Sequence, residues 1–388
     1  MTAVARLALV PRDGFFCKDG RGWFTSASGR GHGLEWPWPS TLLGALRTAW
    51  GRAVEDATGA RFDALNWQKR TAAVKLGRTL ALRRAMSEPW EPRHRVWPAP
   101  ADALQLEGRA HLYRLDPAPP RVPTLGRDDD EAREALWVAV VKDPAKPVPG
   151  PRWWGENRFI AWLTGDNVPA NDPHSAFSLN HRLQVRVGIA SDTLTAEEAV
   201  LFSHEVVETL EPKAEWAVGA EVTLPDDTLP RLATLGSDSR IAAIEELSEK
   251  VFEFPDKLLG AFRDGCRGLR LVVVTPACFQ AGWLPDGFER RGTEFVGTLP
   301  GVQGQVVLRA ALVPRPMHIS GWDIVAGTPK PTVRAVPPGA VYFFERLGGR
   351  PFDEGDARAL WLAAMGTRTD EGFGRVVPGV WSPRRDEP

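Results

Sequence analysis

The stretch Glu371-Gly372-Phe373-Gly374-Arg375 joins a helical pattern to a strand pattern near the C-terminus. Residues 354–365 have helical apolar spacing, and residues 375–381 read as a strand. Upstream, the apolar, β-branched run 269–275 is typical of a buried strand, and further strands are predicted at 306–313 and 340–345. Strand, long connection, strand, strand, helix, strand predicts a βαββαβ unit, the ferredoxin-like plan.

The first half of the chain permits the same plan with wide interruptions. We expect a strand at 4–10, a helix at 40–54, a hairpin of strands 201–210 and 216–222, and a strand near 238. Residues 59–180 read as an irregular insertion containing a basic helical stretch (Lys69, Arg70, Lys75, Arg78, Arg83 and Arg84). The sequence therefore predicts an α+β protein with two ferredoxin-like domains, residues 1–258, with the insertion at about 59–180, and residues 259–388.

Composition and motifs exclude several protein classes. The chain has no apolar run of the ~18 residues that a membrane span needs, and Met1 to Val10 does not resemble a signal peptide. Its three cysteines form no close pair, which argues against a disulfide framework and a thiolate zinc site. No HExxH, paired Cys motif, P-loop, GxSxG elbow or GGDD-like acidic pair occurs. We therefore expect a cytoplasmic protein with no cofactor and no metal.

Charge is distributed unevenly although the net charge is only −1. Residues 1–52 hold seven basic residues against three acidic ones, and residues 69–95 hold eight against two. Residues 191–256 hold sixteen acidic residues against four basic ones. This polarity predicts one face that attracts polyanions and another that repels them, unless each run is a solvated face.

Two glycine-rich loops are the candidate phosphate-binding segments. The first carries Lys18, Arg21, Arg30 and His32, and it leads into a helix whose expected N-cap is Ser40. We expect Lys18, Arg21, Arg30 and Arg47 to contact phosphates, with Ser40 and Thr41 at the helix N-terminus. The second is Gly372-Phe373-Gly374, where N–H groups of the glycines would line an RNA groove and Phe373 would pack beneath the loop or against a base.

His32 is the one titratable residue with an enzymatic interpretation. In its Gly- and Arg-rich loop it could contact RNA, act as a general acid–base in RNA cleavage, or have no special role.

The motifs together resemble the RAMP superfamily of CRISPR effector proteins. More narrowly, they resemble the subunit of the type III-B Cmr complex that holds the 5′ tag of the crRNA. The matching segments are Phe15-Phe16-Cys17-Lys18-Asp19-Gly20-Arg21 followed by Pro39-Ser40-Thr41-Leu42-Leu43-Gly44-Ala45-Leu46-Arg47; Arg186-Val187-Gly188-Ile189-Ala190 with Thr195-Ala196-Glu197-Glu198; Leu235-Gly236-Ser237-Asp238-Ser239-Arg240; Gly321-Trp322-Asp323 with Pro329-Lys330-Pro331; Pro338-Gly339-Ala340-Val341-Tyr342-Phe343-Phe344-Glu345; and Glu371-Gly372-Phe373-Gly374.

The resemblance implies a subunit without nuclease activity that binds the crRNA tag. Its implied protein partners are the large polymerase-like subunit and the backbone subunits, and target RNA would be met only indirectly. Arg186 and Arg240, which lie in matching segments, join the candidate RNA-binding residues. Two alternatives stay open: a precursor-crRNA endoribonuclease that uses His32, and an assembly protein whose acidic 191–256 region docks a basic partner.

Overall fold

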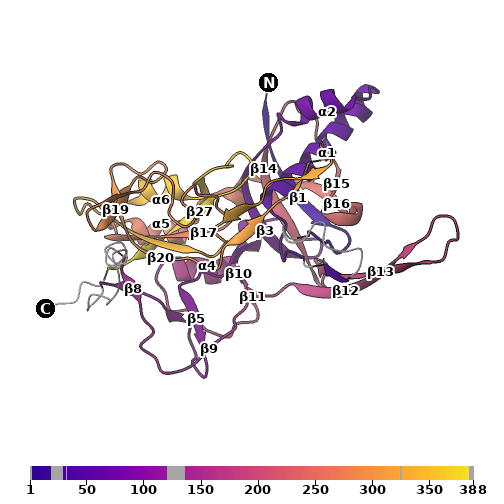
Figure 1. The fold of residues 1–388 in the computed structure, drawn as a ribbon. Coiled ribbons are helices and arrows are strands. Elements are labelled where there is room, and N and C mark those ends of the chain that lie inside the picture. The colour runs from indigo at the N-terminus through magenta and orange to yellow at the C-terminus, as the bar shows by residue number, and fades with distance from the viewer. Residues whose placement is uncertain (1, 19–28, 32, 120–135, 324–325, 384–388) are drawn as a thin grey trace.

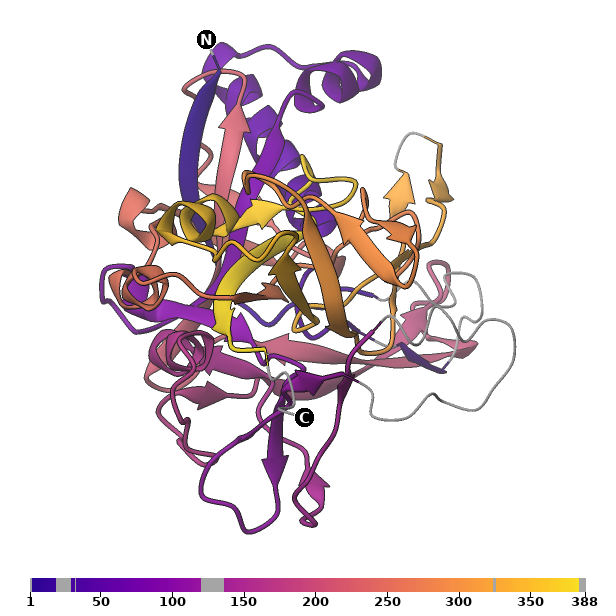
Figure 2. The same ribbon diagram turned by 90° about the vertical axis from the view of Figure 1, so that its left-hand side faces the viewer.

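The computed structural model, seen from two sides in Figures 1 and 2, describes residues 2–18, 29–31, 33–119, 136–323 and 326–383. Two large sheets dominate these residues, and every strand pairing inside either sheet is antiparallel. Helices are few and short apart from one. The prediction of a mixed α and β protein is confirmed.

The first sheet has eight strands. In spatial order they are β11 (Ala176–Phe177), β10 (Trp153–Gly155), β4 (Arg95–Pro98), β3 (Lys75–Ala85), β14 (Ala214–Leu224), β1 (Ala3–Pro11), β16 (Ile241–Glu246) and β15 (Leu232–Thr234). Its centre, β3-β14-β1-β16, has the strand order of a ferredoxin-like sheet. Helix α1 (Pro39–Thr58) connects β1 to β3, but only a 3₁₀ turn, Ser237–Ser239, takes the place of a helix between β14 and β16.

The second sheet has seven strands and the same central order. Its strands are β18 (Glu289–Arg291), β19 (Glu294–Gly297), β20 (Val306–Leu312), β25 (Val341–Arg346), β17 (Gly268–Val273), β27 (Arg375–Trp381) and β26 (Ala363–Ala364). Helix α6 (Glu354–Leu360) connects β25 to β27, whereas the β18–β19 hairpin stands between β17 and β20. Each sheet therefore has one of the two helices that a full βαββαβ unit contains. The helix predicted at 354–365 is shorter than expected, because Leu362 turns the chain (φ 55°) into β26.

Helix α1 begins one residue before the predicted position. Trp38 is its N-cap, and Pro39 occupies the first helical position, where its missing N–H costs nothing and its fixed φ suits the helix. Ser40 is therefore inside the first turn and is not the cap. Leu42, Leu46 and Trp50 belong to the core cluster that α1 forms with the first sheet. Gly59 ends the helix in the left-handed conformation (φ 69°).

Strand β3 corrects the prediction for residues 69–95. Helix α2 (Ala64–Thr71) covers only the start of the basic stretch, and Lys75–Ala85 is a central strand rather than a helix. It pairs with β14 along almost its whole length, so a segment taken as part of an insertion supplies the middle of the first sheet.

The rest of the 59–180 segment joins the two sheets. The carboxylate of Asp102 accepts hydrogen bonds from Arg270 of β17 (2.6 Å) and from the indole of Trp162 in α4 (Glu156–Leu163; 2.9 Å). Asp102 and Arg270 are 0% and 2% exposed, so this ion pair is wholly buried. One core cluster accordingly contains residues from both sheets, from α4 and from α5 (Asp256–Phe262).

A long hairpin, β12 (Asn180–Ile189) with β13 (Ala196–Glu208), extends away from the two sheets (Figure 1). The short strand β2 (Gly29–Gly31) lies parallel to β13 at its base. The predicted pairing of 201–210 with 216–222 is wrong except at the turn: Leu210 bridges Glu215, but β13 and β14 then enter different sheets.

Small two- and three-stranded sheets complete the structure. They are β21 (Met317–Ile319) with β24 (Val333–Ala335); β22 (Trp322–Asp323) with β23 (Thr328–Pro329); β5 (Ala103–Leu106) with β6 (Tyr113–Arg114) and β9 (Pro147–Val148); and β7 (Pro117–Ala118) with β8 (Val138–Ala139).

Candidate nucleic-acid interface

Segments far apart in the sequence meet where the two sheets adjoin. A small core cluster contains Trp38 before α1, Cys278, Ile319 of β21, Ala335 of β24 and Phe373. Trp38, directly before the motif that opens α1, and Phe373 of the Gly372-Phe373-Gly374 motif are thereby brought together with β21 and β24, which flank the 321–331 motif. We call this place the junction.

The Gly372-Phe373-Gly374 loop is part of the junction's interior. Phe373 is 0% exposed, so it packs beneath the loop rather than against a base; this is one of the two arrangements expected from the sequence. The N–H of Gly372 donates to the carbonyl of Thr369 (3.2 Å), and that of Gly374 donates to the carbonyl of Pro276 (2.8 Å). These glycine N–H groups are therefore used inside the protein and are not available to a phosphate.

The same loop fastens the first sheet to the second. The N–H of Leu76 in β3 donates to the carbonyl of Asp370 (2.8 Å), and the ammonium of Lys75 pairs with the Asp370 carboxylate (2.7 Å). On the other side, the hydroxyl of Thr275 donates to the carbonyl of Gly372 (3.0 Å). The loop thus acts as a clasp between β3 and the residues that follow β17.

A cavity of about 810 Å³ lies at the junction. We call it the junction cavity; its walls come from the segment before α1, from β3, β4 and β10, and from residues 274–276, 314–318 and 337–338. Four indoles line it (Trp36, Trp38, Trp97 and Trp153), with Glu35, Arg152, Arg315 and His318 as the charged or titratable side chains. Apolar walls with a few polar groups are typical of ligand sites of this size.

The first glycine-rich loop ends beside this cavity. Lys18 and Gly33 form a backbone bridge, the N–H of Leu34 donates to the carbonyl of Cys17 (2.8 Å), and Gly33 and Leu34 both line the cavity. Arg30 lies in β2, opposite Ser203 of β13. Arg21 and His32 lie outside the described residues.

The expected residues on α1 have different surroundings. Ser40 and Thr41 are half-buried in the first turn, and the N–H of Thr41 donates to the carbonyl of Trp38 (2.9 Å). Arg47 is half-buried and donates to the carbonyls of Val74 (3.2 Å) and Ala72 (3.4 Å) at the end of α2. Arg47 thus holds α1 against the segment that precedes β3.

Arg186 and Arg240 come together at the base of the hairpin. Arg186 pairs with Asp238 (2.8 Å), and Arg240 pairs with Asp13 and donates to the side-chain carbonyl of Gln184 (3.0 Å). Asp238 is held at positive φ (62°), which fits its position in a tight turn. The two guanidinium groups therefore face carboxylates of their own chain.

His204 is enclosed beside this pair. Its ring packs against Phe16 with ring centroids 4.5 Å apart, and its Nε2 has no hydrogen-bond partner among the described residues. Burial, followed by the neighbouring positive charge of Arg186, lowers the pKa of His204 below its usual value. His204 is thus a buried side chain of β13, although it lies in the exposed hairpin.

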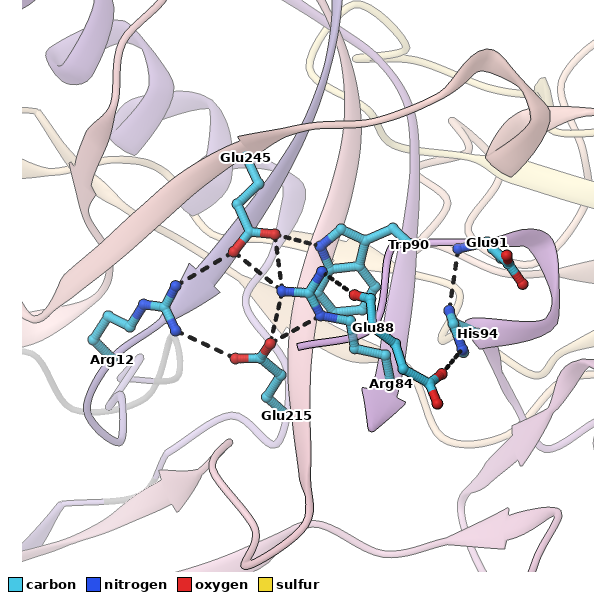
Figure 3. A network of polar contacts seen from close by, with 8 residues as sticks. All are labelled: Arg12, Arg84, Glu88, Trp90, Glu91, His94, Glu215 and Glu245. Atoms are coloured by element: carbon cyan, nitrogen blue, oxygen red, sulfur yellow. Dashed lines mark hydrogen bonds and ion pairs between the residues drawn. The ribbon is translucent and has the colours of Figure 1, made fainter. Parts of the chain in front are cut away.

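The basic and acidic runs neutralise each other across the first sheet. Arg84 of β3 pairs with Glu215 of β14 (2.7 Å) and Glu245 of β16 (2.9 Å), and Arg12 at the end of β1 reaches the same two carboxylates (Figure 3). Trp90 also donates to Glu245 (2.8 Å). The expectation of separate basic and acidic faces is wrong for these residues, because β3 and β1 adjoin the strands that carry the acids.

A histidine stands at the edge of this network. His94 is 8% exposed; its Nδ1 accepts from the N–H of Glu91 (3.1 Å), and its Nε2 faces the Glu88 carboxylate at 3.2 Å (Figure 3). Burial, with a smaller contribution from Arg93, lowers the pKa of His94.

Comparison with protein families matches residues 7–381 to a family with the description CRISPR-associated protein (Cas_Cmr3). The chain belongs to the Cas_Cmr3 family. It is thus a Cmr-type subunit of a type III CRISPR effector, and this part of the expected resemblance is confirmed. Comparison with curated protein sequences gives no match.

Three solved structures contain chains similar to this Cas_Cmr3 protein. Two are cryo-EM structures of the type III-B Cmr-beta complex bound to cognate target RNA, one of them also with AMPPnP. Their chains are 14% and 13% identical, with TM-scores of 0.43 and 0.41, over 87% of this chain and 86% of theirs. The third is a crystal structure of the Csm3-Csm4 subcomplex of the type III-A complex (10% identity, TM-score 0.34, 90% of this chain and 98% of that chain). The family match alone decides the assignment.

Several residues of the junction were missed by the sequence reasoning. Trp36 stands in the unusual run Trp36-Pro37-Trp38-Pro39, and Arg315 stands between two prolines. A proline after Trp36 and prolines on both sides of Arg315 restrict the backbone at these positions, which is a signal for a presented side chain. Nothing local in either segment indicates that the two face one cavity.

The described residues of this Cas_Cmr3 protein show little other chemistry. They contain no group of three or more His, Cys, Asp or Glu residues placed to hold a metal ion. Burial raises the pKa of Cys17 and of Cys266 to about 12, so both thiols are protonated near neutral pH. No helix in the described part is long and apolar enough to cross a membrane.

Proposed function

We propose that this chain is the non-catalytic crRNA-binding subunit of a type III-B Cmr complex, where it holds the 5′ tag of the crRNA. The observation that carries the proposal is the aromatic junction cavity, which lies where the first glycine-rich loop ends at Gly33 and where the start of α1 supplies Pro39 and Leu42 to the wall. Aromatic side chains with cations beside them are what single-stranded RNA requires: faces for unstacked bases and charge for the backbone.

Lys18, Arg21, Arg30 and His32 are the proposed RNA contacts of the first loop, with Ser40 and Thr41 at the helix N-terminus. Support comes from the end of that loop at Gly33, which lines the cavity. Arg47, Arg186 and Arg240 already have hydrogen-bond or ion-pair partners within the protein. In this proposal they shape the site, and they contact RNA only where a phosphate replaces the protein partner. Gly372, Phe373 and Gly374 support the cavity from behind.

We further propose two degenerate ferredoxin-like domains, with the boundary near residue 258. The central strand order of both sheets supports this, and the missing helix in each explains why the pattern is incomplete. In this proposal the 59–180 segment is needed for the fold, since it supplies the central strand β3 and the buried ion pair of Asp102 with Arg270.

The hairpin supports the proposed bridging to other subunits of the complex. On β12 the apolar side chains are the exposed ones: Leu183, Val185, Val187 and Ile189 are 43–60% exposed. An apolar stripe that faces solvent is typical of a surface covered in an assembly. We propose that it docks a backbone subunit; Val185→Asp should then weaken co-purification of that subunit and leave RNA binding by the isolated chain unchanged.

The test of the main proposal is the RNA that co-purifies with the assembled complex and with the isolated chain. We expect small-RNA sequencing to return crRNAs with one common 5′ tag, and the isolated chain to bind tag RNA more tightly than scrambled RNA of equal length. Incubation with precursor crRNA should leave it uncut. Equal affinity for tag and scrambled RNA would refute tag recognition, and cleavage that disappears in His32→Ala would refute the non-catalytic assignment.

A further inference from the structure

We propose that the junction cavity receives one unpaired base of the bound RNA, and that Trp36 is the face on which the base stacks. The inference rests on the proposed function, because it names the part of the RNA that this site takes. It is drawn from three features of the cavity: its size, the position of Trp36 and the exposed, unpaired guanidinium of Arg315 on its wall.

The size of the cavity needs an occupant. Protein interiors are close-packed, and a space lined by large apolar side chains lowers stability unless something fills it. At about 810 Å³, the junction cavity is within the range of small-molecule sites. Its walls are held firmly: the clasp at Asp370 ties the β3 side to the other sheet, and the N–H of Ala101 donates to the carbonyl of Gly339 (2.7 Å).

Trp36 is the indole in the cavity that keeps accessible surface. Trp38, Trp97 and Trp153 are 4%, 1% and 9% exposed, whereas Trp36 is only half-buried. Its ring is packed against the rings of Trp153 (centroids 5.2 Å apart), Trp216 (6.0 Å) and Phe15 (6.3 Å). A ring fixed by three aromatic neighbours has little side-chain entropy to lose when a base stacks on it.

The one carboxylate among the residues that line the cavity is already paired. Glu35 accepts hydrogen bonds from Arg152 (2.6 Å) and from the indole of Trp153 (3.2 Å). A free carboxylate would repel a phosphate, but this one already carries its own guanidinium.

One unpaired cation lies on the wall of the cavity. Arg315 lines the cavity, is exposed, and its side chain has no hydrogen-bond or ion-pair partner among the described residues; the exposed imidazole of His318 lines the same cavity. Many other arginines of the described chain form ion pairs with carboxylates, as Arg84 does in the network of Figure 3. A base inside the cavity would leave its phosphate outside, within reach of the Arg315 guanidinium.

The chemistry favours single-stranded RNA over the other occupants of an aromatic cavity. A proline-rich peptide would use the indoles but would leave the Arg315 guanidinium without a counter-charge. A duplex would present stacked bases that cannot enter. A single-stranded nucleic acid provides bases for the aromatic walls and a phosphate for Arg315.

The test measures the affinity of the full chain for fluorescent single-stranded tag RNA. Trp36→Ala should weaken binding by about 5- to 150-fold, the range for loss of one base–aromatic stack, whereas Trp36→Phe should retain most of the affinity. Trp67→Ala serves as the control. Trp67 belongs to α2, packs against Phe62 and does not line the cavity, so this variant should bind RNA as wild type does.

A second arm changes the RNA and leaves the protein intact, so it does not depend on whether the variant folds. Tag RNAs with a single abasic site, scanned along the tag, should show one position at which the loss of the base weakens wild-type binding by about 5- to 150-fold. 4-thiouridine at that position should cross-link to the peptide that contains Trp36. Uniform abasic effects, or wild-type binding by Trp36→Ala, would overturn the base pocket while tag binding itself survives. No RNA binding by the wild-type chain would overturn both.

Discussion

Gly374→Ala is expected to destabilise the protein without changing its intrinsic affinity for RNA. Gly374 has φ of 72°, a conformation that L side chains rarely adopt. A Cβ at this position would overlap the carbonyl oxygen of Met365, far inside the 3.0 Å that real Cβ atoms keep from neighbours. That carbonyl cannot simply move, because the N–H of the same residue donates to the carbonyl of Gly374 (2.9 Å).

Two costs add in this variant. Left-handed backbone costs an alanine about 1–2 kcal/mol, and forcing a group into a filled space costs a further ~1–3 kcal/mol. Gly348→Ala separates the two, since Gly348 also has positive φ (87°) but has nothing within 4 Å of a Cβ. The difference between the variants, about 1–3 kcal/mol, corresponds to a further loss of roughly 1–4 °C in Tm, because the entropy of unfolding of a chain of 388 residues gives about 1.2 °C for each kcal/mol.

The assay is thermal melting of wild type, Gly348→Ala and Gly374→Ala, followed by RNA titration of each at a temperature where all are folded. We expect Gly374→Ala to have the lowest Tm and to bind RNA as wild type. Wild-type melting with weakened RNA binding would refute the reasoning, because it would mean that the Cβ meets the RNA backbone rather than Met365. In that case the Gly372-Phe373-Gly374 loop would be an RNA contact after all.

Three further outcomes are expected. Arg21→Ala combined with Arg30→Ala should lower the slope of log affinity against log salt by about 0.7 for each lost phosphate contact, and an unchanged slope would remove the first loop from the site. Glu215→Lys should lower the free energy of unfolding by about 3–5 kcal/mol, because Glu215 is 4% exposed between two arginines, whereas Glu198→Lys on the exposed hairpin should change it little; equal stability of the two would contradict the buried network. Since the pKa of His94 is lowered in the folded protein, protonation costs more there than in the unfolded chain, so stability should fall as the pH drops below about 6.5. Melting from pH 8 to 5 should show this fall, and His94→Gln should reduce it; the same slope in both would contradict the assignment.

Apolar runs made most of the second sheet predictable. The segments expected at 269–275, 306–313, 340–345 and 375–381 all form strands within a few residues of the predicted bounds. Such runs are buried on both faces, so the sequence signal does not depend on which strand lies next to them. The same holds for β1 and for the apolar face of α1.

Strand β3 was missed for the opposite reason. Arg78, Arg83 and Arg84 break its apolar pattern and favour a solvated helix when the segment is considered alone. In the structure each of these arginines has a carboxylate on a neighbouring strand or turn: Glu221, Glu211 and Glu215. A strand with charges becomes a central strand only because other strands supply the opposite charge, and that information is not local.

The junction could be predicted only in part. The glycine loops and the start of α1 were identified as candidates from residue type, and the structure brings their neighbours to one cavity. The role of Phe373 followed from the sequence as one of two alternatives. Trp36 and Arg315 were missed because they lie in different halves of the chain, and only the packing of the two sheets makes them neighbours.

The pairing of the charge runs also changes what RNA binding can depend on. With Arg84 and its neighbours on β3 neutralised inside the first sheet, few described cations remain for a polyanion at the junction, and the net charge of −1 supplies no general attraction. Affinity from phosphate contacts should therefore be modest, since each contact contributes separately through counterion release. A larger share must come from contacts that do not depend on charge. The half-buried face of Trp36 at the junction cavity is such a contact, and this is the physical reason to expect base capture there rather than binding of the RNA backbone alone.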